Sequence, residues 1–389
     1  MRSRDFRLIV AAWGLSALGD FLALIALTLR VEEQTGSGLA VAGLLVASAL
    51  PVVVLNPLGG WLVDRFETRT VLAAVAGFQT LIAVLLAILD GYAATLALAF
   101  LLNAGLTVER PALFALIPRI VGEEAAPRAY AWFESVKYAT FTVGMLLGGT
   151  LTQAFSASTA LLVDAATCAL AVAAALALRV RRGARDPDEP PEKGALSAGI
   201  RLLWGDRLLR VLIAVLAGSV VFAGIDNVAT VFFARDVLEV GGAGYGALSA
   251  AWGVGMVAGA TLAGRVVTAA RAPAAMIAAT LAMGAGIAGT AASGALAPAV
   301  AAMVLGGLGN GLMNVAMRVL LQARVEERVR GRAYSAFQGV MTIGDFAAFA
   351  AGGALVELLG ARETLLLAGV GCVAAGLLGS PAARRRATV

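Results

Sequence analysis

The stretch Gly59-Gly60-Trp61-Leu62-Val63-Asp64-Arg65-Phe66-Glu67-Thr68-Arg69 lies between two long apolar segments. Its charged side chains cannot lie in hydrocarbon, so they mark a tight turn at the water surface. The two glycines would let the end of one helix approach a neighbouring helix closely. The stretch therefore predicts a short charged connection between two membrane spans, although an ordinary cytoplasmic turn would carry similar charges.

The composition is that of a membrane protein with many spans. Of the 389 residues, 60% are hydrophobic and 14% are charged, whereas about 25% of a soluble domain is charged. A helical span takes about 20 apolar residues, so twelve spans need roughly 240 residues and leave only short loops. The net charge of +5 is not a nucleic-acid footprint, because the basic residues lie in predicted loops, where they set topology.

Twelve apolar segments follow one another along the chain, at about 6–30, 38–63, 70–89, 93–118, 129–152, 157–179, 208–234, 243–264, 272–292, 296–322, 333–356 and 363–381. Most Arg residues fall at alternate ends of these segments, and only Arg30, Arg235 and Arg362 fall at the opposite ends. Since cytoplasmic loops carry an excess of Lys and Arg, this asymmetry predicts that both termini are cytoplasmic. The high Ala, Gly and Arg content suggests a bacterial source, and hence the bacterial cytoplasmic membrane.

Several classes of chemistry are absent from the sequence. There is no histidine, so a proton relay has to use carboxylates. Cys168 and Cys372 fall inside predicted spans and are interpreted as small apolar fillers. Neither Lys137 nor Lys193 lies in a Gly-rich phosphate-binding loop, so ATP is not the obvious energy source. We expect no cofactor, no metal and no enzyme activity, because no nucleophile–base set or metal-ligand cluster occurs.

The two halves of the chain look like repeats. The segment Arg128–Val136 aligns with Arg332–Val340, and Gly148-Gly149 aligns with Gly352-Gly353 at the same spacing. The polar, Pro-rich interval 181–205 is interpreted as a cytoplasmic linker. The sequence thus predicts a six-helix bundle at 1–180, the linker at 181–205, and a second six-helix bundle at 206–389.

The charged loop, the repeat and the linker together resemble the major facilitator superfamily over essentially the whole chain. Gly60, Asp64, Arg65 and Arg69 match the family's loop between helices 2 and 3, while Glu67 stands where that pattern has Gly. The resemblance implies an all-α integral membrane protein of twelve transmembrane helices, in two six-helix bundles related by a pseudo-two-fold axis. Transporters of this architecture hold their substrate between the repeats near the midplane.

The resemblance also gives the charged loop a role in gating. If the family packing holds, Asp64 faces the start of helix 11, where the helix dipole favours a carboxylate. That contact would latch the cytoplasmic side shut in the outward-open state. The corresponding position of the second half is Gly264, so the latch would be one-sided.

A second family feature is the glycine motif that antiporters carry in helix 5. Here Gly144, Gly148 and Gly149 match it, whereas Thr140 and Met145 replace its first Gly and its Pro. The resemblance implies export, and close packing of helix 5 at the interface between the halves. Four further segments resemble those of bacterial enterobactin exporters and macrolide-efflux proteins, and they also overlap with a lysophospholipid-transporter pattern. These segments are 15–20, 110–118, 331–334 and 342–345.

Ionisable side chains inside the spans are the candidates for transport chemistry, because each costs about 2.5–3.5 kcal/mol on insertion scales. Asp20 and Asp226 lie near the middle of segments 1 and 7, which line the central cavity in the family. A carboxylate there can take up a proton facing one side and release it facing the other. We expect Asp20 to be the leading proton-coupling group and Asp226 the second; a packing role for each is the alternative.

Arg110 and Glu134 should lie at similar depth on neighbouring antiparallel helices. A buried pair between them would be a switch, since protonating Glu134 leaves Arg110 unpaired; a permanent structural pair is the alternative. Asp345, near the middle of helix 11, could belong to the proton path or to the interface between the halves. Asp164 lies on helix 6, which is peripheral in the family, so structural support is expected.

Four amides in the spans are polar positions that could bond a substrate or one another: Asn103, Asn227, Asn310 and Asn314. The remaining cavity residues are mostly apolar, which suits an amphipathic or lipophilic substrate. The sequence therefore predicts a proton-coupled transporter that exports drugs, macrolides or siderophore-like molecules by alternating access. The alternative is a lysophospholipid or lipid transporter of the same fold. The expected partners are a small-molecule substrate, protons and the lipid bilayer, and the protein is expected to act as a monomer.

Overall fold

The computed structural model describes residues 4–180, 207–325 and 327–384, which are helical almost throughout and contain no strand. The linker expected at 181–205 lies outside these residues, so the boundaries between linker and bundles stay a prediction. The chain divides into two compact units. The first comprises Met1–Gly36 and Gly43–Glu189, and the second comprises Ser37–Ala42 and Pro190–Val389.

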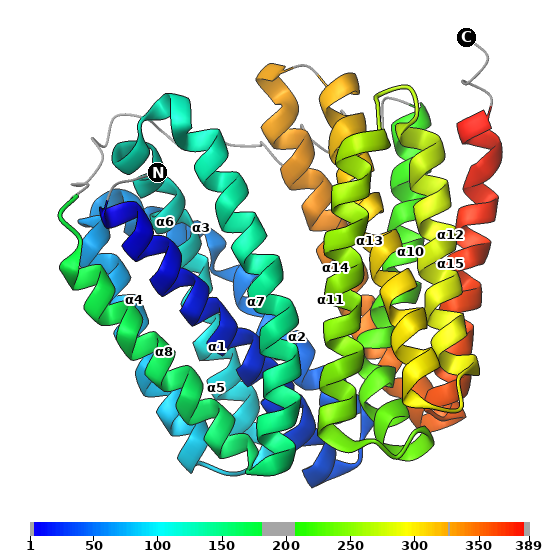
Figure 1. The fold of residues 1–389 in the computed structure, drawn as a ribbon, viewed down its shortest axis with the longest axis horizontal. Coiled ribbons are helices and arrows are strands. Elements are labelled where there is room, and N and C mark those ends of the chain that lie inside the picture. The colour runs from blue at the N-terminus through cyan, green and yellow to red at the C-terminus, as the bar shows by residue number, and fades with distance from the viewer. Residues whose placement is uncertain (1–3, 181–206, 326, 385–389) are drawn as a thin grey trace. The chain divides into compact units, whose positions relative to one another are not determined.

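The described part of the first half contains eight α-helices, of which α5 and α6 continue one span and α2 and α3 form one bent pair (Figure 1). They are α1 Arg4–Thr35, α2 Gly38–Val54, α3 Asn56–Arg65, α4 Thr68–Ile88, α5 Tyr92–Ala104, α6 Leu106–Val121, α7 Ala126–Ala154 and α8 Ala157–Ala177, with a short 3-10 turn at Glu123–Ala125. Segment 2 was expected as one helix but is bent by 50° between α2 and α3, whereas segment 4 corresponds to one span, Tyr92–Val121, with a local interruption at Gly105. Pro57 cannot continue the helix before it, and α5 ends at Gly105, where α6 begins.

The second half contains α10 Arg207–Phe232, a π-helical turn η2 Phe233–Val237, α11 Gly241–Val266, α12 Ala272–Ala292, α13 Leu296–Arg324, α14 Glu327–Leu359 and α15 Ala361–Arg384. Over the described residues, ten helical stretches are long and apolar enough to cross a membrane. The bent pair α2 and α3 would be an eleventh. The remaining expected span, at 129–152, corresponds to α7. This helix is 29 residues long but less apolar than the other spans, because four Thr and three Gly fall between residues 140 and 152.

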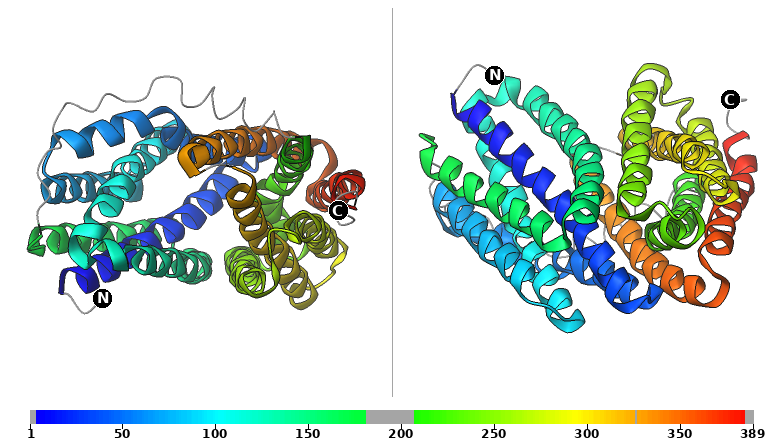
Figure 2. Two further views of the ribbon diagram at one scale, coloured as in Figure 1. Left: turned by 90° about the horizontal axis from the view of Figure 1, so that it is seen from above. Right: turned by 60° about the horizontal axis from the view of Figure 1, so that its bottom comes forward.

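The packing pattern inside each unit is the same. In the first unit α1 packs against α7 and α8, α4 against α8, and α3 against α6. In the second unit α10 packs against α14 and α15, α12 against α15, and α11 against α13. Figure 2 shows these neighbours from two further sides. The internal repeat of the sequence therefore corresponds to a repeated arrangement of helices.

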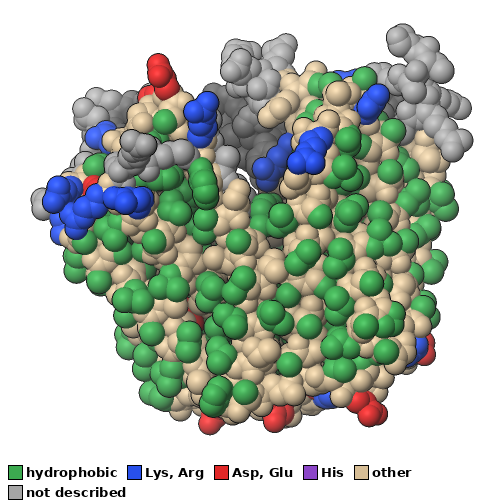
Figure 3. All heavy atoms as spheres, in the orientation of Figure 1, with side chains coloured by type: hydrophobic (Ala, Val, Ile, Leu, Met, Phe, Trp, Pro, Cys, Tyr) green, Lys and Arg blue, Asp and Glu red, His purple; other side chains and the backbone are tan. Residues whose placement is uncertain are grey.

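The surface matches a membrane environment. Large apolar side chains are exposed on the helices, for example Leu170 at 56% and Leu378 at 81%, and they cover the middle of the face in Figure 3. In the first unit, Lys and Arg gather at the end where the N-terminus lies. Lipid would cover the apolar belt, while the charged end would lie in water.

Candidate functional site

Three carboxyl groups meet in the interior of the first unit, each from a different helix. They belong to Asp20 of α1, Glu109 of α6 and Asp164 of α8. Asp164 is fully buried, and both Asp20 and Glu109 lie within electrostatic range of it. Among the described side chains, Arg110 supplies the positive charge that acts on both Asp20 and Glu109, and it is exposed, so the buried position expected for it from the sequence was wrong. We call these four side chains the acidic cluster.

Close packing of α1 on α8 builds one side of the acidic cluster. A side chain at Gly19 would collide with Oδ1 of Asp164 and Oγ1 of Thr167, so only glycine lets the two helices approach there. Ser16 and Cys168 lie 3.9 Å apart between Oγ and Sγ, and the Cys168 thiol lies 3.8 Å from Oδ1 of Asp164 as a donor. Oδ2 of Asp164 is buried with no hydrogen-bond partner in the structure.

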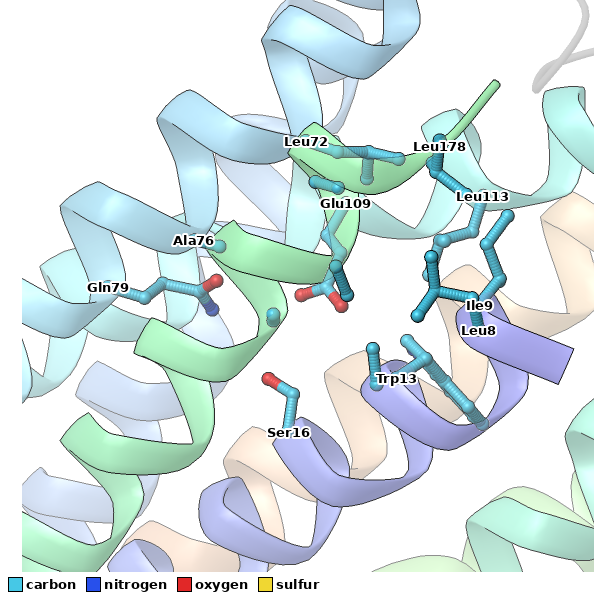
Figure 4. A pocket seen from close by; sticks show the side chains of 14 residues that line it. Leu8, Ile9, Trp13, Ser16, Leu72, Ala76, Gln79, Glu109, Leu113 and Leu178 are labelled. Atoms are coloured by element: carbon cyan, nitrogen blue, oxygen red, sulfur yellow. The ribbon is translucent and has the colours of Figure 1, made fainter. Parts of the chain in front are cut away.

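A pocket lies beside the acidic cluster, enclosed by α1, α4, α6 and α8. Its wall is mostly apolar and includes Trp13 and Leu113. Three polar side chains, Ser16, Gln79 and Glu109, turn toward the same space in Figure 4. Oε2 of Glu109 is buried and without a hydrogen-bond partner. The pocket therefore has one acidic group in an otherwise neutral lining.

The carboxylates expected in the second half have different surroundings. Asp226 of α10 is partly buried, and its Oδ1 accepts a 2.5 Å hydrogen bond from Thr230, one turn along the same helix. Asp345 of α14 faces the same helix: its Oδ1 lies 3.9 Å from where a Cβ of Gly224 would be. The proton-coupling roles assigned to both residues from the sequence stay predictions.

Three of the four asparagines donate within their own helices, while Asn310 of α13 donates to Sδ of Met283 on α12, at 3.8 Å. Asn103 donates to the carbonyl of Ala99, and Asn227 donates to that of Gly224. Asn314 donates to both the carbonyl and the side-chain oxygen of Asn310, at 3.0 and 2.8 Å. These bonds show how the amides are satisfied within the chain; substrate binding by them stays a prediction.

The glycines of the charged loop do not act as a pair. Gly59 packs α3 on α6, because a side chain there would collide with the carbonyl of Thr107. Gly60 has open space where a side chain would be. The expectation of close approach at both glycines was therefore wrong for Gly60, which lies on a different face of the short helix α3.

The charged side chains of the loop are also divided between tasks. Arg69 donates to the carbonyls of Leu176 and Leu178 and so caps the end of α8. Arg65 lies over the ring of Trp61, 5.5 Å from its centroid. Asp64 is exposed, and the latch assigned to it stays a prediction.

The helix-5 glycines pack within the first unit. A side chain at Gly144 would lie 2.8 Å from the carbonyl oxygen of Leu18, and one at Gly148 would lie 2.9 Å from that of Leu22. Gly149 is buried on the same helix. Gly144 and Gly148 thus bring α7 onto α1 within the first unit, and the expected location at the interface between the halves stays a prediction.

Three acidic residues of the first half differ in how the structure bears on them: Glu134, Glu109 and Asp164. The Glu134 side chain lies outside the described residues, so its expected pairing with Arg110 stays a prediction. Glu109 received no role from the sequence, and Asp164 was expected to give structural support on a peripheral helix. The sequence did contain a signal for Glu109. An ionisable side chain inside a membrane span is costly and therefore marks a candidate functional site, and Glu109 stands next to Arg110 in such a span.

Known proteins resemble this chain in sequence over most of its length. The model of the major facilitator superfamily matches residues 9–269 and 230–388. The chain therefore belongs to the major facilitator superfamily and is a transporter of that family. A relative described as the uncharacterized MFS-type transporter YfiS of Bacillus subtilis strain 168 is 24% identical over 383 residues, which are 95% of this chain and 91% of the relative.

Solved structures of low sequence identity share the fold. The nucleoside transporter NupG, in its D323A mutant, is 14% identical with a TM-score of 0.76, over 97% of this chain and 98% of that one. A bacterial homologue of the human lysosomal transporter Spinster is 15% identical with a TM-score of 0.75, over 100% of this chain and 99% of that one. At this identity the likeness concerns the fold alone.

Proposed function

We propose that this protein is a proton-coupled secondary transporter that exports small amphipathic or lipophilic compounds from a bacterial cell. The observation that supports proton coupling is the acidic cluster, in which the carboxyl groups of Asp20, Glu109 and the fully buried Asp164 interact with one another and the exposed Arg110 acts on the first two. Three negative charges against one positive charge would be costly in a low-dielectric interior. Carboxyl groups so placed share protons and respond together to wetting.

Alternating access would turn this response into transport. Opening toward one side hydrates the cluster and favours release of a proton, whereas closing dries it and favours uptake. A bound proton would thereby favour one conformation over the other, as any ligand with unequal affinity for two states does. Asp20 is the leading coupling residue in this scheme, because it belongs to the longest apolar helix of the first half and lies within range of Arg110.

Direction, substrate and membrane orientation rest on further observations. The three matches to the antiporter glycine motif favour export. The scarcity of charged side chains within the spans favours amphipathic or lipophilic substrates over sugars or amino acids. Arg side chains at the N-terminal end of the first unit favour cytoplasmic termini. We propose a monomer in the bacterial cytoplasmic membrane.

The first test is energised efflux from a bacterium that lacks its main efflux pumps. Cells carrying the wild type, Asp20→Asn or Glu33→Gln would be loaded with a cationic dye or a macrolide, with and without a protonophore. Glu33 is the matched control, since it lies on the same helix and is exposed. We expect efflux by the wild type and Glu33→Gln, and its loss with the protonophore or Asp20→Asn.

The other outcomes are equally informative. Efflux that survives Asp20→Asn would move the coupling to Glu134, Asp226 or Asp345. Efflux that ignores the protonophore would contradict proton coupling. If neither compound is exported, a fluorescent lysophospholipid flipped in vesicles of the purified protein would replace the drug-export function with the lipid alternative.

A further inference from the structure

The pocket beside the acidic cluster leads toward Glu109 from the end of the first unit where the chain begins. It is lined by the first turns of α1 and by the last turns of α8, including Leu8, Ile9 and Leu178. Deeper in the bundle its lining becomes polar, with Ser16, Gln79 and Glu109. The pocket therefore connects one end of the helices with an acidic group inside them.

Water is the ligand that fits this space. The volume that the centres of water molecules can occupy is ≈ 40 Å³, which is room for about three waters. A buried carboxylate oxygen without a partner loses at least the free energy of an unmade hydrogen bond, so it favours hydration or protonation. Oε2 of Glu109 is such an atom, and Glu109 lines the pocket.

A chain of polar groups continues from the pocket to Asp164. Ser16 lies in the pocket wall and is the neighbour of Cys168, whose thiol is directed at Oδ1 of Asp164. Asp164 is fully buried, and its Oδ2 has no hydrogen-bond partner in the structure. Asp164 is therefore the innermost of these groups, and the structural support expected for it from the sequence stays a prediction.

Among the described side chains, few charged or titratable groups lie around this series of polar groups. α1 contributes Asp20, α6 contributes Glu109 and Arg110, and α8 contributes Asp164 and Cys168. α4 contributes the neutral Gln79. On α7, which packs on α1, Lys137 lies over the ring of Tyr138, 5.8 Å from Nζ to its centroid.

We propose that this pocket is a water-filled route for protons inside the first bundle, in which Glu109 receives or releases the proton at the pocket and Asp164 holds it at the inner end. Asp20, with Arg110 beside it, passes the proton on toward the transport cycle. This inference rests on the proposed proton coupling. It separates the proton route from the path of the substrate, because the pocket lies between helices of one unit.

Water access can be tested without any transport. Ala171 lines the pocket, whereas the adjacent Leu170 is 56% exposed on the surface of the unit. Ala171→Cys and Leu170→Cys would be labelled in membranes with a small charged methanethiosulfonate reagent. The parent chain gives the background, since Cys168 and Cys372 are both fully buried. We expect the thiol of Ala171→Cys to react with the reagent at least about tenfold faster than that of Leu170→Cys, because only a thiolate in contact with water reacts. Equal, slow reaction of both would overturn the route.

Transport measurements test the proton step itself. Three variants would be compared in vesicles of the purified protein: Glu109→Gln, Asp164→Asn and the pocket-filling Ala171→Phe. Each should lower the flux of the cationic dye or macrolide driven by a pH gradient, by about tenfold or more. Exchange of labelled for unlabelled substrate without a gradient should persist, since it needs no net proton movement. Leu170→Phe is the matched control and should keep both activities.

The two levels of proposal fail in different ways. If the gradient-driven flux of all three variants equals that of the wild type, the route is wrong although proton coupling stands. If the wild type shows no pH-driven flux, the proposed function fails, and the labelling rates still decide whether water enters the pocket. A variant that loses exchange as well is misfolded, and the labelling pair then decides.

Discussion

Gly19 of α1 lies directly against Asp164 of α8. A side chain at Gly19 would collide with the carboxylate oxygen of Asp164 and would lie only 3.2 Å from its Cα. The innermost acid of the first bundle is thus placed by a residue that has no side chain. Packing and the chemistry of the acidic cluster depend on the same contact.

The first prediction follows from that contact. Gly19→Ala should destabilise the protein by about 1–3 kcal/mol, because overpacking a tight contact forces the backbone to move. The apparent melting temperature of the detergent-solubilised protein would measure it. Gly60→Ala is the matched control, since no atom lies within 4 Å of the added group, and it should be neutral or slightly stabilising. Equal melting temperatures for the two variants would contradict the predicted packing.

A second prediction concerns Arg30, which is 6% exposed at the far end of α1. It donates 2.6 Å from Nη1 to the carbonyl of Leu86 and 2.8 Å from Nη2 to Oγ of Ser158, so it joins α1 to α4 and α8. Arg30→Met keeps the apolar stem and removes both donors. It should cost about 2–3 kcal/mol, the range for hydrogen bonds to a charged group plus an unsatisfied carbonyl.

The same melting experiment would include two comparisons. Arg30→Lys should be intermediate, because one ammonium cannot reproduce the fork of a guanidinium. Arg119→Met should change little, since Arg119 is exposed. If Arg30→Met melts with the wild type, the joint between the three helices does not stabilise the bundle.

Much of this fold could be predicted from the sequence, because membrane spans are written in long apolar runs. All twelve segments coincide with helices or with a pair of successive helices, and two of them are joined by the turn Phe66-Glu67, since the rest of 59–69 lies in α3 and α4. The bend between α2 and α3 was not predicted, since a continuous apolar run hides a change of direction. The resemblance of Arg128–Val136 to Arg332–Val340 corresponds to the equivalent placement of α7 and α14.

The acidic cluster was predicted only in part, for a physical reason. Asp20 was recognised because a carboxylate in mid-span is costly, but Asp164 and Glu109 carry the same cost and were given no transport role. What distinguishes them is the face of the helix on which each lies. That face is fixed by close contacts such as Gly19 on α8 and Gly144 on α1, which a single sequence does not reveal.

A third prediction concerns the family loop. Arg69 caps the carbonyls at the end of α8, while Oδ2 of Asp5 accepts from the backbone N–H groups of Arg179 and Val180 just beyond it. Arg69→Ala should therefore release this end of the helix, with a loss of about 1–3 kcal/mol in local stability. Hydrogen exchange of the amides at 174–180 would measure it.

The control for that experiment lies in the same loop. Arg65→Ala removes only a contact with the exposed ring of Trp61, worth about 0.5–1 kcal/mol at such a site, and should leave exchange at 174–180 unchanged. Increased exchange in both variants would show that the whole loop, and not Arg69 alone, holds the end of α8.

The last prediction separates the two halves of the chain in proton coupling. Asp226 already accepts a hydrogen bond from Thr230, whereas Asp20 shares its surroundings with two further acids and Arg110. A carboxylate with a permanent donor on its own helix has less reason to change its proton with conformation. Asp226→Asn should therefore keep pH-driven flux within about threefold of the wild type, and Asp20→Asn should lower it by about tenfold or more. A loss of flux in Asp226→Asn equal to that in Asp20→Asn would place a coupling group in each half, as the repeat of the sequence allows.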